Sequence, residues 1–321
     1  MTTRITATLA AGGLALAALA TTAAADEWRP TQPVTMVVGF AAGGPVDTVG
    51  REVAQRMSEY LGQPVVVENV GGAGGLIAAN RVVQAAPDGH TIFFAAAGNV
   101  VIRPLVDRDT SIVDQLDFVS LVSSSPHVMV VPASSPFETV GDLVEYAREN
   151  PGELNFASAG TGAAAHLGLE MLKLYADIDI EHIPYAGVAP SLVDVASGAV
   201  DGTLSSMPSL VPMLDAGQIR ILGVSNDGPN NRGAPLISET VENYGYTVWY
   251  GALVPAGTPR EAIDALNSAI HFALSDEDMV ARFAAQNNTM AASTPEEMAE
   301  FFREDQARWR EVIEAADVRI E

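Results

Sequence analysis

Residues 34–47 read VTMVVGFAAGGPVD, and this stretch shows how the chain is organised. The apolar run Val34–Val38 is typical of a buried strand, and the apolar spacing over 46–61 is that of one helix face. Pro45 suits the first position of that helix, where its missing N–H has no partner to lose. The stretch therefore predicts a strand, a glycine-rich loop and a helix, which together begin a β-α-β unit.

The same order of elements repeats along the chain. Further strands are expected at 64–68 and 91–95, with a helix between them, and a second alternating series runs from 128 to 224. From 260 to 316 the pattern is mainly helical. The chain has 321 residues, which favours two lobes. We therefore expect an α/β fold in which mostly parallel sheets are covered by helices.

Composition excludes several classes of function. Acidic residues number 40 and basic residues 17, so the formal net charge is −23, and no nucleic-acid partner is expected. Lys173 is the only lysine, and no phosphate-binding G-x-x-x-x-G-K-[ST] loop is present. The absence of cysteine excludes disulfides and thiol nucleophiles. The histidines form no H-x-x-x-H pair, so no metal site is expected.

The N-terminus has the pattern of an export signal. Arg4 precedes the apolar run 5–20, and Ala23-Ala24-Ala25 is a small-residue cleavage motif. A membrane anchor is the alternative, but the run is short for a span of about 20 residues. We expect residues 1–25 to be a cleaved signal peptide and the mature protein to lie outside the cytoplasm.

The loop in the opening stretch can bind an anion. Its glycines allow close approach of a ligand, and backbone N–H groups at a helix N-terminus attract negative charge. Asp47 falls in the first helical turn, where it can accept an N–H, and Arg51 is placed to pair with it. A tight turn without a ligand remains the alternative.

A second loop, SAGTGAAAH at 158–166, also lies between a predicted strand and a predicted helix. As an anion site it would offer N–H groups and the hydroxyls of Ser158 and Thr161. His166, at the start of the predicted helix, either faces a ligand cleft or is a hydrogen-bonded histidine in the protein interior. A third loop, GGAGG at 71–75, is either a ligand-contacting rim or a plain connection.

The second loop also permits two enzymatic interpretations. Gly160-x-Gly162-x-x-Ala165 fits the dinucleotide fingerprint, with an acidic residue about 20 positions later. A secreted hydrolase could use Ser158 with His166, although no G-x-S-x-G motif and no third member are evident. Both interpretations remain alternatives to a binding protein.

Short motifs in order along almost the whole chain carry a family resemblance. They are WxPxxP (28–33), FAAGGPxD (40–47), LGQPVVVEN (61–69), GAGG (72–75), APDG (86–89), GTG with HL (160–162, 166–167), PYxG (184–187), WYG (249–251), PAGTP (255–259) and a closing helix with Trp309. The sequence resembles the substrate-binding proteins of tripartite tricarboxylate transporters, also called Bug or TctC-like receptors. Gly39 stands where proline is common, and alanines at 163–165 replace a more polar run.

This resemblance implies a two-lobed periplasmic binding protein of type II-like architecture, which closes on a small organic carboxylate in a cleft between its lobes. It implies that one glycine-rich loop from each lobe grips the carboxylate, and that the partners are the membrane subunits of the transporter. We expect no cofactor and a monomer. The chain order predicts a first lobe of 26–123 plus 229–321 and a second lobe of 124–228, with the final helices returning to the first lobe.

The expected ligand contacts lie in the two loops and at the far end of the cleft. The N–H groups of Gly44 and Gly162 are expected to point at the carboxylate. The full predicted set is Phe40, Ala41, Ala42, Gly43, Gly44, Asp47, Gly72, Asn99, Ser158, Thr161, Gly162, Ala163, His166, Tyr185, Ser205 and Ser206.

Overall fold

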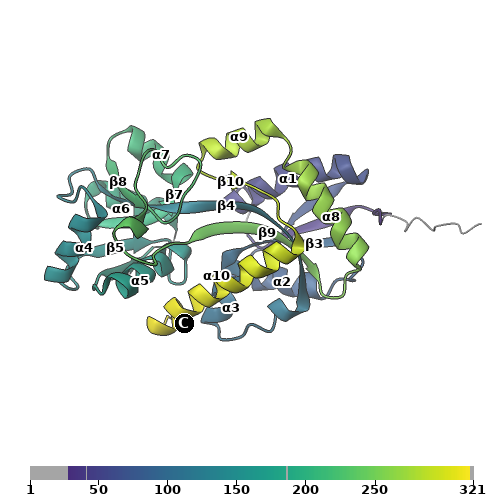
Figure 1. The fold of residues 1–321 in the computed structure, drawn as a ribbon, viewed down its shortest axis with the longest axis horizontal. Coiled ribbons are helices and arrows are strands. Elements are labelled where there is room, and N and C mark those ends of the chain that lie inside the picture. The colour runs from purple at the N-terminus through teal and green to yellow at the C-terminus, as the bar shows by residue number, and fades with distance from the viewer. Residues whose placement is uncertain (1–27, 41, 186, 319–321) are drawn as a thin grey trace, which may run out of the picture.

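The computed structural model describes residues 28–40, 42–185 and 187–318. The predicted signal peptide and Ala41 lie outside these residues. Two α/β lobes lie side by side, and the long strands β4 and β9 run from one to the other (Figure 1). Among the described residues, no helix has both the length and the apolar character needed to cross a bilayer.

The first lobe is built on the predicted β-α-β pattern. Its parallel strands are ordered β2-β1-β3, with each register fixed over four or five residue pairs. Val38, Met57 and Phe94 are fully buried where α1 packs on this sheet. The elements are β1 (Val34–Val38), α1 (Pro45–Leu61), β2 (Val65–Asn69), η1 (Ala73–Gly75), α2 (Leu76–Val83), β3 (Thr91–Ala96), the π-helical turn η2 (Gly98–Ile102), α3 (Arg103–Val106) and η3 (Val113–Gln115).

The second lobe also has three parallel strands that alternate with helices, in the order β7-β5-β6. Its first helix, α4, begins with a capping box in which Thr139 and Asp142 satisfy each other's backbone N–H groups. The elements are α4 (Val140–Glu149), β5 (Asn155–Ser158), α5 (Ala164–Ala176), β6 (Glu181–Pro184), α6 (Val188–Ser197), β7 (Gly202–Ser206), α7 (Met207–Asp215), β8 (Ile219–Val224) and η4 (Ile237–Glu239).

Two long strands make the sheet mixed. β4 (Leu116–Pro132) pairs with β9 (Thr247–Pro255) over residues 116–126, and from His127 onward it pairs with β7 and β8. Every antiparallel pairing among the described strands involves β4 or β9, whereas the pairings within each lobe's core are parallel. The two-lobed α/β class is confirmed, and the crossing strands add an antiparallel part to it.

The C-terminal elements lie mainly against the first lobe, but the last helix reaches both. α8 packs on α1 and β4, while α10 contacts β4 and α3 and also α5 of the second lobe (Figure 1). Trp309 of α10 is buried against Tyr246, with the two ring centroids 5.2 Å apart. These elements are α8 (Arg260–Ala273), α9 (Glu277–Ala285), β10 (Thr289–Met290) and α10 (Pro295–Ala315).

The lobe boundaries at 123/124 and 228/229 stay predictions. β4 runs unbroken through the first boundary, so the change of lobe falls within one strand. Beyond the second boundary, Leu236 still forms a bridge with Val224 of β8. The chain therefore keeps contact with the second lobe until shortly before β9 begins.

Candidate ligand-binding site

A cavity of about 840 Å³ lies between the lobes, and both predicted loops line it. One loop connects β1 to α1 and the other connects β5 to α5, so each lobe contributes one strand-to-helix loop. The lining residues are Phe40, Ala42, Gly43, Gly44, Pro45, Val46, Gly74, Ala96, Gly98, Ile102, Arg103, Ala159, Gly160, Thr161, Gly162, Ala163, Ala164, Val248 and Tyr250.

The first loop is held from behind by Asp47. Its Oδ2 accepts the Gly43 N–H at 2.8 Å and the Arg51 Nε at 2.9 Å, and its Oδ1 accepts from Asn69 Nδ2 at 2.9 Å. Although burial alone would raise the pKa of Asp47, hydrogen bonds from Arg51, Gly43 and Asn69 hold it below its ordinary value. The predicted Asp47–Arg51 pair is confirmed, and it supports the loop from outside the cavity lining.

The helix that follows has open N–H groups at its start. Its first backbone hydrogen bond runs from Thr48 N to Gly44 O, so the N–H groups of the preceding residues have no intrahelical acceptor. Within the described part of the chain, the N–H groups of Val46 and Asp47 find no other acceptor. Gly44 and Val46 line the cavity. This helix end therefore presents donors and a positive dipole to the space between the lobes.

The start of α5 is arranged in the same way in the second lobe. Its first helical bond runs from Leu167 N to Ala163 O. Among the residues that the structure describes, none accepts from the N–H groups of Thr161 and Ala164, and both residues line the cavity. The two helix N-termini thus open into one space from different lobes.

Two neutral histidines hold the second loop. The Gly162 N–H donates to His166 Nδ1 at 3.0 Å, and Ser158 Oγ accepts the Gly160 N–H at 3.1 Å while lying 2.6 Å from His182 Nε2. The two imidazole rings stack with centroids 3.8 Å apart. Burial, the largest cause, lowers the pKa of both histidines to about 4, so they are uncharged near neutral pH.

This arrangement corrects the prediction for Gly162. Its N–H is taken by His166, whose ring is buried, so it is not directed at the ligand. The interior alternative for His166 is the one the structure supports. Ser158 is likewise buried behind the loop, and its hydroxyl lies near His182, not His166. A Ser158–His166 hydrolytic pair is therefore absent from the described residues.

Asn99 and Gly72, two more of the predicted contacts, do not line the cavity. The amide of Asn99 is fully buried and is used internally, since Nδ2 donates to Gly74 O at 2.8 Å and Oδ1 accepts from Ala96 N at 3.1 Å. Gly72 lies next to the cavity-lining Gly74 in the same loop. The third loop thus reaches the cavity through Gly74, and Asn99 fixes it in place.

Tyr185, Ser205 and Ser206 lie outside the main cavity as well. The Tyr185 hydroxyl donates to Asp194 Oδ2 at 2.6 Å. Ser205 and Ser206 line a smaller hollow of about 150 Å³, which shares Ala163 and Ala164 with the main cavity. The serines are therefore next to the site, on its second-lobe side.

Sequence reasoning missed two polar groups in the lining, Arg103 and Tyr250. Arg103 begins α3 after an apolar stretch, and a lone arginine there gives no recognisable motif. Tyr250 belongs to the WYG motif, which contributes to the family resemblance but does not by itself indicate a ligand contact. Tyr250 is 9% exposed, its hydroxyl has no hydrogen-bond partner among the described residues, and burial raises its pKa to about 12. It therefore remains a neutral donor.

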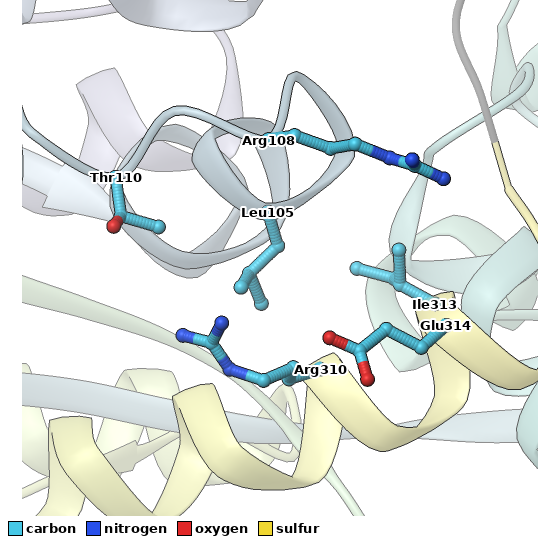
Figure 2. A pocket seen from close by; sticks show the side chains of 6 residues that line it. All are labelled: Leu105, Arg108, Thr110, Arg310, Ile313 and Glu314. Carbon is cyan, nitrogen blue, oxygen red and sulfur yellow. The ribbon is translucent and has the colours of Figure 1, made fainter.

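A different hollow of about 420 Å³ lies between α3 and α10, away from both glycine-rich loops (Figure 2). Arg108 and Arg310 extend from opposite sides of it, and the Glu314 carboxylate points toward the same space. Arg108 pairs with Asp317 at 3.1 Å. Because cations and a carboxylate share this hollow, its chemistry differs from that of the interlobe cavity, where no acidic residue is among the described lining residues.

Comparison with known proteins decides the family. Residues 49–318 match the tripartite tricarboxylate transporter family receptor. The chain belongs to this family. A UPF0065 protein of Pseudomonas sp. (strain P51) is 37% identical, with 95% of this chain and 92% of that protein covered. Protein BugT of Bordetella pertussis is 30% identical, with 96% of each chain covered.

Solved structures give the same result. A protein of R. palustris solved with adipate is 32% identical, with a TM-score of 0.76 and coverage of 90% of this chain and 99% of that chain. MatC from Rhodopseudomonas palustris, solved with bound malate, is 28% identical, with a TM-score of 0.72 and coverage of 88% and 99%. This tripartite tricarboxylate transporter receptor is thus a solute-binding protein and not an enzyme, and its family implies an extracytoplasmic location.

Proposed function

We propose that this protein binds a small organic carboxylate in the interlobe cavity and delivers it to the membrane subunits of a tripartite tricarboxylate-type transporter. The observation that carries the proposal is the pair of helix N-termini, one per lobe, that open into a cavity whose described lining includes no acidic side chain. Open N–H groups and helix dipoles favour an anion there. The relatives solved with adipate and malate support the same class of ligand.

Local donors can hold an anion even though the whole chain is strongly acidic. The formal net charge is −23, but charges farther away than about 8–10 Å are largely screened at physiological salt. A carboxylate that touches both helix ends joins the two lobes. Ligand binding therefore favours the arrangement in which the lobes are close, because only that arrangement allows both sets of contacts.

The proposal can be tested by thermal unfolding with a panel of mono-, di- and tricarboxylates. A bound acid at 100 times its Kd should stabilise the fold by about 2.7 kcal/mol. Matched alcohols and amides of the same carbon skeletons are the controls and should give no shift. Stabilisation by an amide equal to that by its acid would contradict carboxylate recognition. Conversion of a ligand during incubation would contradict a receptor that binds without turnover.

The remaining parts of the proposal concern processing and assembly. We propose that residues 1–25 are removed on export and that the mature receptor is a periplasmic monomer. Intact-mass analysis of exported protein should give a chain that begins near Asp26, and light scattering should give the mass of one copy. Retention of residues 1–25 would contradict the predicted cleavage.

A further inference from the structure

The lining of the interlobe cavity contains one cationic side chain, Arg103. Among the described lining residues, no other is an arginine, lysine or histidine, and none is an aspartate or glutamate. Arg103 begins α3, which follows η2 at the end of β3. It therefore comes from a different element than the helix ends of α1 and α5, and it gives the cavity an additional place for negative charge.

The structure holds the Arg103 guanidinium in one orientation. Its Nε lies 2.6 Å from Asp107 Oδ2 one helical turn later. Its stem lies against Gly74, where an added Cβ would be 3.1 Å from Arg103 Cδ, and Asn99 fixes Gly74 through its carbonyl. No hydrogen bond within the described residues uses the terminal nitrogens of Arg103. Asp107 thus acts as a positioning residue and leaves these N–H groups for a ligand.

Apolar side chains make up much of the rest of the first-lobe lining. Phe40, Ala96 and Ile102 come from this lobe, and Val248 comes from the crossing strand β9. These residues offer no polar partner to the middle of a ligand. Tyr250 adds one neutral donor next to them.

We infer that the ligand is an aliphatic dicarboxylate, with one carboxylate at the helix N-termini and the second on Arg103. A guanidinium presents paired N–H groups that match a carboxylate, so Arg103 determines the preference for a second negative charge. The inference rests on the proposed carboxylate-binding function and names its substrate class. Without Arg103 the cavity would still bind a single carboxylate at the helix ends.

Calorimetry with matched acids tests this assignment. The probes are straight-chain α,ω-dicarboxylates of four to eight carbons and the monocarboxylates of the same lengths. The proteins are the wild type, Arg103→Gln and Arg81→Gln. Arg81 is the matched control because it pairs with Glu68 at 2.6 Å on the surface of the same lobe and does not line the cavity.

The wild type should bind at least one dicarboxylate about 10- to 100-fold more tightly than its monocarboxylate, since hydrogen bonds between charged groups have this strength. Arg103→Gln should remove that preference and leave monocarboxylate binding within about threefold, and Arg81→Gln should change neither. Arg103→Lys, which keeps the charge but not the planar fork, should retain only part of the preference.

Four results would count against the inference or against the function on which it rests. Equal affinity of the wild type for both series, or an unchanged preference in Arg103→Gln, would show that no second carboxylate sits on Arg103, while the receptor function would stand. Loss of both series in a folded Arg103→Gln would place the only carboxylate on Arg103. Failure of every acid to bind the wild type would contradict the proposed function itself.

Discussion

The two glycine-rich loops are held in shape by different kinds of acceptor, a charged side chain in the first lobe and a neutral one in the second. In the first lobe, a buried carboxylate with a lowered pKa holds the loop through Gly43 and is balanced by the Arg51 guanidinium. In the second lobe, uncharged His166 accepts the equivalent bond from Gly162. Each loop thus uses some of its N–H groups internally to fix its shape, and the helix that follows begins with N–H groups that face the cavity. The geometry needed for anion binding can therefore be built with a charged support or with a neutral one.

Removal of the charged support should have the largest effect. Asp47→Ala leaves the Gly43 N–H, Asn69 Nδ2 and Arg51 without their common acceptor. We expect a loss of about 2–4 kcal/mol of unfolding free energy, and weaker carboxylate binding, because several charged hydrogen bonds disappear at a buried site. Denaturant unfolding and calorimetry measure the two losses.

Asp142→Ala is the control for that change. Asp142 also stands in the first turn of a helix, but it is exposed and is not one of the residues that line the cavity. Its loss should cost about 1 kcal/mol of stability and leave affinity unchanged. If the two variants bind ligand equally well, the support from Asp47 is not required for the site.

Valine substitutions at one glycine of each loop should affect unfolding free energy and ligand affinity to different extents. Gly162 has φ +78°, so valine there is strained by about 1–2 kcal/mol, whereas Gly44 has φ −77° and ψ 170°, which valine adopts readily. Gly162→Val should lower both unfolding free energy and affinity. Gly44→Val should lower affinity mainly, because Gly44 lines the cavity at the N-terminus of α1, where an added side chain would occupy the space of the ligand. Equal losses of stability would contradict this distinction.

The neutral support should make the second loop sensitive to acid. The pKa values of His166 and His182 are lowered to about 4 by burial, so between about pH 6.5 and about pH 4 the unfolded chain binds protons that the folded chain does not. The unfolding free energy should therefore fall as pH decreases through this window. Glu170 and Lys173 lie near the pair, and Lys173 opposes its protonation.

His166→Asn is the matching variant, since an amide oxygen can accept the Gly162 N–H without titrating. It should reduce the dependence of stability and carboxylate affinity on pH between about 6.5 and about 4. Asp47 stays ionised over this range because its pKa lies below the ordinary value. A pH profile identical to that of the wild type would show that His166 is not a source of acid sensitivity.

The smallest effect is expected for Arg51→Gln. The Arg51 side chain is 51% exposed, and exposed ion pairs contribute about 0.2–1 kcal/mol. Asp47 keeps its bonds from Gly43 and Asn69 in this variant. Affinity should change by less than about threefold. Complete loss of carboxylate binding would mean that a side-chain cation on α1, and not the helix end, holds the anion.

Individual strands and helices could be predicted because the spacing of apolar residues within each segment indicates them. The strand Val34–Val38 has the predicted bounds, and the predicted helix face over 46–61 lies within α1, since apolar spacing defines both elements. The part of β4 before residue 128 is not predicted, because residues 120–126, SLVSSSP, do not have the apolar pattern of a buried strand. Their pairing with β9 comes from residues more than 100 positions later in the chain.

The sequence indicates the two loops that line the cavity, but it does not identify which of their groups are free to donate. Sequence placed Gly44 and Gly162 at equivalent positions, yet only the tertiary contact with His166 shows that the second N–H is already used. Asn99 was expected to meet the ligand, but its amide is satisfied by Ala96 and Gly74. Such outcomes depend on which partner is nearer in space, and motif spacing carries no information about that distance.

The paired strands β4 and β9 also have a mechanical consequence. Hydrogen-bonded strands resist sliding past each other but accommodate twist. The lobes are therefore joined by a paired two-stranded connection that can twist, and not by a flexible linker. On one face, α10 contacts both lobes (Figure 1), and we expect these contacts to limit how far the lobes can separate on that face. We expect ligand binding to rotate one lobe slightly relative to the other about the paired strands β4 and β9. Twisting these strands stores strain, which favours return of the lobes to their ligand-free arrangement when the ligand leaves.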